Sequence, residues 1–218
     1  MSKKRRNILL AFIIPALLFY VVFWISPVLM SFYYGLTNWR GMGDFDIVGM
    51  KNYANLIKQG TLFNSMGNTI KYTLFVVIWG NIQALALAMI LNMKLKARGV
   101  FRTIFYIPAL FSTIVVAFLW SYVYAPHYGM ISEIFNLFGS SNAPNLLGSK
   151  ATSLFAAAFV ETWKTSGTMT IIYLAGLQNI SEEVIESAKI DGCNGWQAIR
   201  YVKIPMLANT ITVNVMLG

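Results

Sequence analysis

Long apolar runs alternate with polar connections along the whole sequence. Four runs, at about residues 8–34, 70–91, 103–124 and 151–177, are as long as the roughly 20 residues that an α-helix needs to cross a bilayer. A fifth run occupies residues 206–218, which is too short to cross, so the chain looks truncated. With 57% hydrophobic and 11% charged residues, the sequence predicts an all-α integral membrane protein with a single transmembrane domain and five spans at least partly present.

Positive charge gathers in particular connections, and this predicts the orientation in the membrane. Residues 3–6 carry four Lys or Arg residues, residues 92–102 carry four, and residues 181–205 carry three, whereas the connection after the third run has only Lys150. The connection after the first run also carries four Lys or Arg residues, but they are spread over about 37 residues, so it argues only weakly against this pattern. The positive-inside rule therefore places the N-terminus and residues 181–205 in the cytoplasm. The net charge is +9, but the basic residues flank apolar runs and do not form a continuous basic surface, so nucleic acid is not an expected partner.

Residues 181–205 form a polar interruption between two apolar runs, and their pattern predicts a helix, a tight turn and a second helix. Ser181 can cap the first helix, whose first turn carries Glu182 and Glu183, where the helix dipole favours negative charge. Gly192 can end that helix in the left-handed conformation. A second amphipathic piece begins near Trp196. We expect this segment to lie at the membrane surface.

The same segment carries a family signature. Glu186-Ser187-Ala188, then Gly192, then Val202-Lys203-Ile204-Pro205 resemble, at the right spacing, the cytoplasmic coupling loop of bacterial ATP-binding-cassette (ABC) importer permeases. Ser187, Val202 and Ile204 depart from the usual alanine, isoleucine and leucine. Ile190-Asp191-Gly192 and Trp196-Gln197 are similar to the carbohydrate-uptake branch, of maltose and glycerol-phosphate type, and so is the run from Arg98 to Pro108.

This resemblance implies a MetI-like permease fold with about six transmembrane helices in the full chain, in a bacterial-type inner membrane. It implies that the path for a sugar or sugar derivative is completed by a second homologous permease subunit. The other expected partners are an ABC ATPase dimer, an extracellular or periplasmic solute-binding protein and membrane lipid. ATP and Mg²⁺ would bind at the ATPase, and this chain would bind no cofactor. The expected coupling residues are Glu186, Ala188, Asp191, Gly192, Trp196 and Pro205.

Motifs for catalysis are missing from the sequence. It contains no G-x-x-x-x-G-K-[ST] nucleotide loop, no H-E-x-x-H, no G-x-S-x-G and no Cys/His cluster. We therefore expect neither an enzyme nor a metal site, and an active transporter would take its energy from another subunit. The single cysteine, Cys193, excludes an internal disulfide.

The fourth apolar run contains two charged residues near its middle. Glu161 and Lys164 are three apart, so they share a helix face, and the cost of charge in a membrane predicts a pair that faces the bundle interior or a cavity. Such a pair either lines the translocation path or only holds helices together. The other expected path residues are Trp163, Thr165, Ser166 and Asn209. Thr168 could bond solute hydroxyls and Tyr173 could stack on a sugar ring, although membrane aromatics more often pack.

Polar residues also occur in the second run. Asn81 and Gln83 are expected to bond neighbouring helices more than to touch the solute. Two other functions stay open from the residues alone. A stand-alone secondary transporter would use Glu161 and Lys164 for proton coupling, and a non-transporting scaffold would use residues 181–205 to recruit a cytosolic protein.

Overall fold

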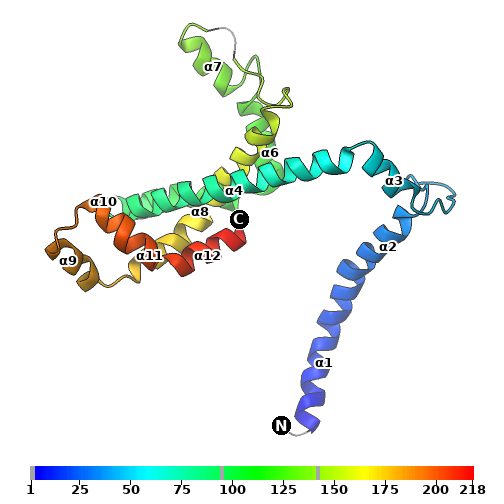
Figure 1. Ribbon diagram of the computed structural model, residues 1–218, viewed down its shortest axis with the longest axis horizontal. Helices are drawn as coiled ribbons and strands as arrows, with labels where there is room; N and C mark the ends of the chain where they lie inside the picture. The colour runs from blue at the N-terminus through cyan, green and yellow to red at the C-terminus, as the bar shows by residue number, and fades with distance from the viewer. Residues whose placement is uncertain (1–2, 94–95, 141–142) are drawn as a thin grey trace. The chain divides into compact units, whose positions relative to one another are not determined.

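The computed structural model describes residues 3–93, 96–140 and 143–218, with side chains from residue 11 onwards. The chain divides into two compact units, residues 1–67 and 68–218, which are described separately (Figure 1). Both are helical, and the only β-type pairing in the described part is a bridge between Thr37 and Ile47. The predicted all-α fold is confirmed. Lys94, in the basic connection at 92–102, lies outside the described residues.

The first unit begins with a continuous helix made of α1 (Lys3–Tyr20), the π-helical turn η1 (Val21–Ile25) and α2 (Ser26–Gly35). Its apolar part, residues 11–35, is long and hydrophobic enough to cross a membrane, and none of its span window is buried within the chain. A loop then folds back on the helix end, where the Asn52 side chain donates to the carbonyls of Gly35 at 2.9 Å and Thr37 at 2.7 Å. Asn52 belongs to α3 (Lys51–Lys58), so it fixes this helix to the end of the first span.

Two prolines each follow a widened helical turn. The turn η1 ends two residues before Pro27, and η2 (Ile199–Lys203) ends two residues before Pro205. In each turn the N–H after it donates to the carbonyl five residues back, from Ser26 to Val21 and from Ile204 to Ile199. A proline ring collides with the carbonyl four residues earlier in a regular helix, so a π turn relieves that collision. The helix thus changes type locally before Pro27, whereas Pro15 lies inside α1.

The second unit contains the remaining spans and the polar segment. Helix α4 (Thr61–Asn92) starts at the edge of the first unit and continues through the second. It is followed by α5 (Arg98–Leu110), α6 (Thr113–Val123), α7 (Met130–Leu137), α8 (Ser153–Gln178), α9 (Glu182–Ile190), α10 (Gly195–Ala198), η2, α11 (Ile204–Met206) and α12 (Ala208–Leu217).

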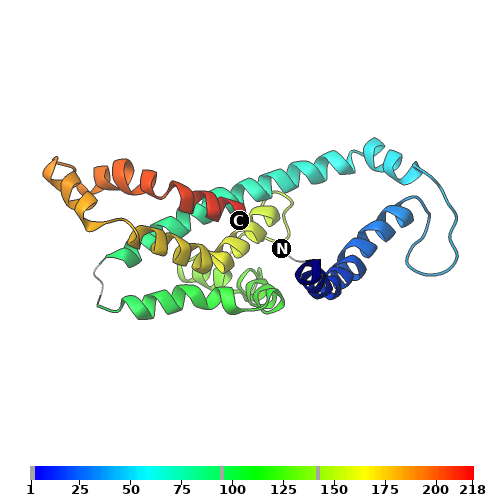
Figure 2. The same cartoon turned by 90° about the horizontal axis from the view of Figure 1, so that it is seen from below.

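The core of this unit lies where α4, α8 and α12 run side by side (Figures 1 and 2). Ala84 and Ala88 on α4 are fully buried, and their small side chains allow close approach of the larger residues on α8. The residues buried in this cluster are Ala84, Ala88, Leu91, Met169, Tyr173, Leu174, Leu177 and Leu207.

Two glycines on α8 set how closely its neighbours pack. A β-carbon added to Gly167 would lie 2.8 Å from the Tyr106 α-carbon, so α5 crosses α8 backbone against backbone. A β-carbon at Gly176 would lie 2.8 Å from a methyl group of Leu207, which seats the start of α12. Because the atoms close to Gly167 are backbone atoms, which cannot move aside, glycine is needed there for steric reasons, whereas at Gly176 the side chains of Leu207 and Thr210 can shift.

The expected spans differ from the structure in two respects. By length and composition, the described residues contain two helices able to cross a membrane, 11–35 and 61–92, or three if the bent pair α5 and α6 is one span. That pair replaces the straight helix expected at 103–124, because its two halves meet at 101°. Helix α8 has 26 residues, but it is not among these candidates, since residues 161–168 make its middle polar.

Candidate functional site: the coupling segment and the polar face of α8

Residues 181–205, which we call the coupling segment, form two helices joined by a glycine turn, as the sequence predicts. Helix α9 ends in a Schellman motif: the Cys193 N–H donates to the Ala188 carbonyl at 2.9 Å, and the Gly192 N–H donates to the Lys189 carbonyl at 3.0 Å. Gly192 has a φ of +83° and no atom within 4 Å of where a β-carbon would be. The turn thus has an open outer surface.

The caps of the two helices differ from the prediction. Ser181 is the N-cap residue of α9, but its side chain makes no capping hydrogen bond. The second helix is capped instead, by Asn194, whose side chain accepts from the Gln197 N–H at 2.9 Å while the Gln197 side chain accepts from the Asn194 N–H at 2.8 Å. This reciprocal pair holds α10 in a defined direction immediately after the turn.

One face of α9 closes a polar groove of about 510 Å³ against the ends of α4 and α8. Glu186 lines this groove, together with Glu182 and Lys189 of α9 and Lys203 of η2. The groove is lined by Asn92, Leu177, Gln178, Ile180, Glu182, Ile185, Glu186, Lys189 and Lys203. The predicted coupling carboxylate therefore lines the same groove as two lysines of its own chain.

The other expected coupling residues fall on two sides of the segment. Ala188 is 8% exposed, so its side chain is largely covered by its own chain. Asp191, Trp196 and Pro205 are exposed, and the Trp196 side chain retains 69% of its accessible surface. Ile190, which sequence reasoning did not select, is 85% exposed beside the turn. An outward-facing aliphatic residue in a polar segment was the available signal for it.

The residues expected along the path divide between two faces of α8. Glu161, Lys164 and Thr165 lie on one face at i, i+3 and i+4 spacing, and Thr168 continues it one turn later. None of these four side chains is buried. The Lys164 ammonium donates to the Thr113 hydroxyl at 2.8 Å. We call this surface the polar face of α8.

Glu161 and Lys164 do not form the predicted ion pair in the described structure. Lys164 turns towards the start of α6, whereas Glu161 lies within electrostatic range of Tyr72 on α4. The two charges share a helix face, but the Lys164 ammonium is bonded to Thr113 and not to Glu161. Thr113 was not selected from the sequence, because nothing in its local pattern shows that it meets a residue 51 positions away.

Trp163 and Ser166 lie on the opposite, packed face of α8. Trp163 meets Trp120 edge to face, with ring centroids 5.4 Å apart, and the Ser166 hydroxyl donates to the Trp163 carbonyl at 2.8 Å. Both line a cavity of about 450 Å³ between α4, α5, α6 and α8, together with Gln83, whose buried side-chain oxygen has no hydrogen-bond partner in the described structure. These two expected path residues are therefore separated from Glu161 and Lys164.

Asn81 and Tyr173 join α4 to α8 through their side chains. The Tyr173 hydroxyl donates to the Asn81 side-chain oxygen at 2.6 Å, and the Asn81 amide donates to the Val77 carbonyl at 2.7 Å. Tyr173 is 1% exposed, so the stacking of its ring on a sugar is ruled out in this structure. The helix-bridging role expected of Asn81 is confirmed. Asn209 is exposed on α12.

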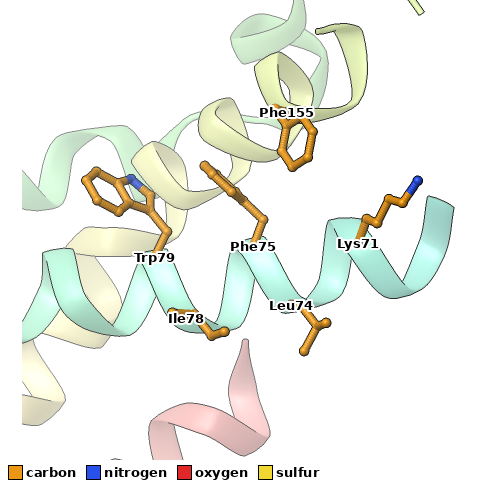
Figure 3. A pocket seen from close by; sticks show the side chains of 6 residues that line it. All are labelled: Lys71, Leu74, Phe75, Ile78, Trp79 and Phe155. Carbon is orange, nitrogen blue, oxygen red and sulfur yellow. The ribbon is translucent and has the colours of Figure 1, made fainter. Parts of the chain in front are cut away.

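An apolar pocket of about 400 Å³ lies on another part of α4 and α8 (Figure 3). The Phe75 ring meets Phe155 edge to face, with ring centroids 5.6 Å apart, and stacks on Trp79, with ring centroids 6.4 Å apart. Lys71 extends away from these rings, so the pocket offers apolar surface only. It does not resemble a site for a polar solute, in contrast to the polar face of α8.

The described residues contain no group of His, Cys, Asp or Glu that could hold a metal ion. The fold and the two sites define an all-helical, multi-pass membrane protein of the permease type. Residues 61–218 match the family described as "Binding-protein-dependent transport system inner membrane component". Because the match covers well over half of the sequence, this chain belongs to that family and is the translocation subunit of an ABC importer. The expected family and inner-membrane location are confirmed.

Individual relatives agree with this placement. The chain is 30% identical to the probable starch degradation products transport system permease protein AmyD of Thermoanaerobacterium thermosulfurigenes, over 93% of this chain and 68% of that protein. It is 32% identical to the trehalose/maltose transport system permease protein MalF of Thermococcus litoralis, over 94% and 70%.

Solved structures show the same fold. One is the crystal structure of a bacterial alginate ABC transporter in complex with an alginate pentasaccharide-bound periplasmic protein. A chain of that structure superposes with a TM-score of 0.80 at 22% identity, over 98% of this chain and 72% of that one. The MetI-like permease fold expected from the sequence is thus confirmed.

Proposed function

We propose that this chain passes a sugar or sugar derivative across the membrane, and that ATP hydrolysis in a separate ATPase subunit drives it through the coupling segment. The relatives named for starch degradation products and for trehalose and maltose support the solute class. A second homologous permease completes the path, and an extracellular or periplasmic binding protein delivers the solute. ATP and Mg²⁺ bind at the ATPase, and the N-terminus is cytoplasmic.

The exposed turn at Gly192 is the observation that carries the coupling role. The Schellman motif and the Asn194 cap fix the directions of both helices at the turn. A partner that contacts Trp196 or Ile190 would therefore move the two helices together. Gly192 has no atom within 4 Å of a β-carbon position, which leaves its outer surface free for an ATPase backbone. The π turn before Pro205 then connects the segment to α12.

The polar face of α8 is the part of the path that this chain contributes. Its residues Glu161, Lys164 and Thr165 are only partly covered by the chain's own helices, and charges near the middle of a membrane helix require water or a polar partner. Asn209 on the exposed face of α12 adds a second polar group. Trp163 and Ser166 support this face from behind by packing.

Reconstitution of the complete importer tests the proposal. The full complex, made with its ATPase, sister permease and binding protein, is expected to take up labelled starch- or maltose-type oligosaccharides only with hydrolysable ATP. A bifunctional reagent attached to Cys193, the only cysteine of this chain, is expected to cross-link to the ATPase subunit. Uptake that persists without the ATPase and collapses with a protonophore would instead establish a secondary transporter.

A further inference from the structure

The helix break between α5 and α6 leaves two residues without helical backbone. The Phe111 N–H donates to the Pro108 carbonyl at 3.3 Å as α5 ends, and both Phe111 and Ser112 are extended, with ψ of 142° and 151°. Ser112 starts the next helix by accepting from the Val115 N–H at 3.3 Å. The two helices then diverge at 101°.

The break lies at the depth of the middle of α8. Lys164, which donates to Thr113 immediately after the break, is the twelfth residue of the 26 in α8. At a rise of 1.5 Å per residue this is about 17 Å from the helix start. The α5 backbone also packs closely on Gly167, which lies one turn further along α8 than Lys164. Both contacts therefore place α5 and the start of α6 beside the middle of α8.

Unwound backbone and a charged side chain at this depth both exclude contact with lipid. Non-helical backbone at membrane depth is found only where it is buried in protein or lines a water-filled cavity. A charged Lys side chain at the centre of a membrane span is costly in lipid and almost always faces the bundle interior or a water-filled cavity. This chain leaves Ser112 and Thr113 exposed and covers Lys164 only in part, so they face either the second permease subunit or a water-filled cavity, and both lie at the path between the two permeases.

The side chains around the α5–α6 break form one polar face and one apolar face. Glu161, Thr165 and Thr168 continue the polar face of α8 beyond Lys164. Phe118, further along α6, is 75% exposed and lies about 140° around the helix from Thr113, as five residues at 100° each place it. Helix α6 therefore carries an apolar face suited to lipid next to the end that meets Lys164.

We propose that the α5–α6 break lines the aqueous translocation path, and that Thr113 is a positioning residue that holds the Lys164 ammonium in it. The path then contains hydrogen-bond donors from α6 and α8 for the oxygens of a polyhydroxylated solute. This inference rests on the proposed transport function, and it adds a second helix and a specific contact to the path.

Water-soluble thiol reagents test the position of the break in the complete importer. In a Cys193→Ser background, the Ser112→Cys variant is expected to react with a charged, membrane-impermeant methanethiosulfonate about 10- to 100-fold faster than the matched Phe118→Cys variant, as the cost of bringing charge into lipid requires. The solute-loaded binding protein is expected to slow the reaction of the Ser112→Cys variant. Equal, slow reaction of both variants in importers with normal uptake would overturn the inference and leave the transport function intact.

Uptake kinetics test Thr113 as a positioning residue. Removing the hydroxyl by Thr113→Val is expected to raise the half-saturating solute concentration about threefold to tenfold, the range of one lost hydrogen bond. The Thr113→Ser variant keeps the hydroxyl and is expected to restore the normal value, which a purely structural role of the methyl group would not do. A normal half-saturating concentration in Thr113→Val refutes the positioning role, while absence of sugar uptake by the unmodified importer refutes the proposed function itself.

Discussion

Gly192 has a close structural match elsewhere in the chain, and this makes its coupling role testable. Gly139, after α7, has a φ of +80° against +83° for Gly192, and neither has an atom within 4 Å of a β-carbon position. Gly139 also closes a Schellman motif, in which its N–H donates to Asn136 at 2.9 Å and the Ser140 N–H donates to Phe135 at 3.0 Å. Replacing each glycine by Asn therefore makes the same local change at two places.

The local cost of the two substitutions is expected to be equal and small. An L-residue in the left-handed region costs about 1–2 kcal/mol, and Asn is the side chain that tolerates this region best. Neither side chain meets its own chain. A difference between the Gly139→Asn and Gly192→Asn variants thus measures what contacts the turn from outside.

The assay is co-purification of the ATPase with the complex, together with solute-stimulated ATP hydrolysis. The Gly139→Asn complex is expected to retain the ATPase. The Gly192→Asn complex is expected to insert normally into the membrane but to lose ATPase binding and stimulated hydrolysis by about tenfold or more, which corresponds to about 1.4 kcal/mol of docking energy. If both variants retained full ATPase binding and stimulation, the turn would not be the contact, and the coupling role assigned to it would be wrong.

Three further predictions follow from the packing and the orientation. Gly167→Leu places a side chain against the α5 backbone and should lower the stability of the purified protein by about 1–3 kcal/mol in thermal unfolding, whereas Gly67→Leu, with open space around it, should not. Tyr173→Phe leaves the part-buried Asn81 side-chain oxygen without its donor and should cost about 1 kcal/mol, and a double variant with Asn81→Leu should cost less than the sum of the single changes. Cys193 should react with an impermeant maleimide in inside-out vesicles only; reaction from the outside would reverse the predicted topology.

The amino-acid sequence by itself determined the local structure of the functional segments. The charged first turn, the apolar spacing and Gly192 were enough to predict α9, the turn and the second helix, because helix ends and left-handed turns depend on a few neighbouring residues. The spacing of Glu161 and Lys164 likewise fixed that they share a face. The family followed from the spacing of Glu186, Gly192 and Pro205.

Only the tertiary structure decided what each face meets. In a membrane helix the side towards lipid and the side towards protein are both largely apolar, so hydrophobic periodicity does not show which one is covered. The packing of α5 and α4 on α8 buries Ser166 but leaves Lys164 partly exposed. The Lys164 ammonium then donates to Thr113, 51 residues away in the sequence, and not to Glu161. The 101° break is likewise visible only in the tertiary structure, where α5 packs on Gly167 and the start of α6 accepts a hydrogen bond from Lys164.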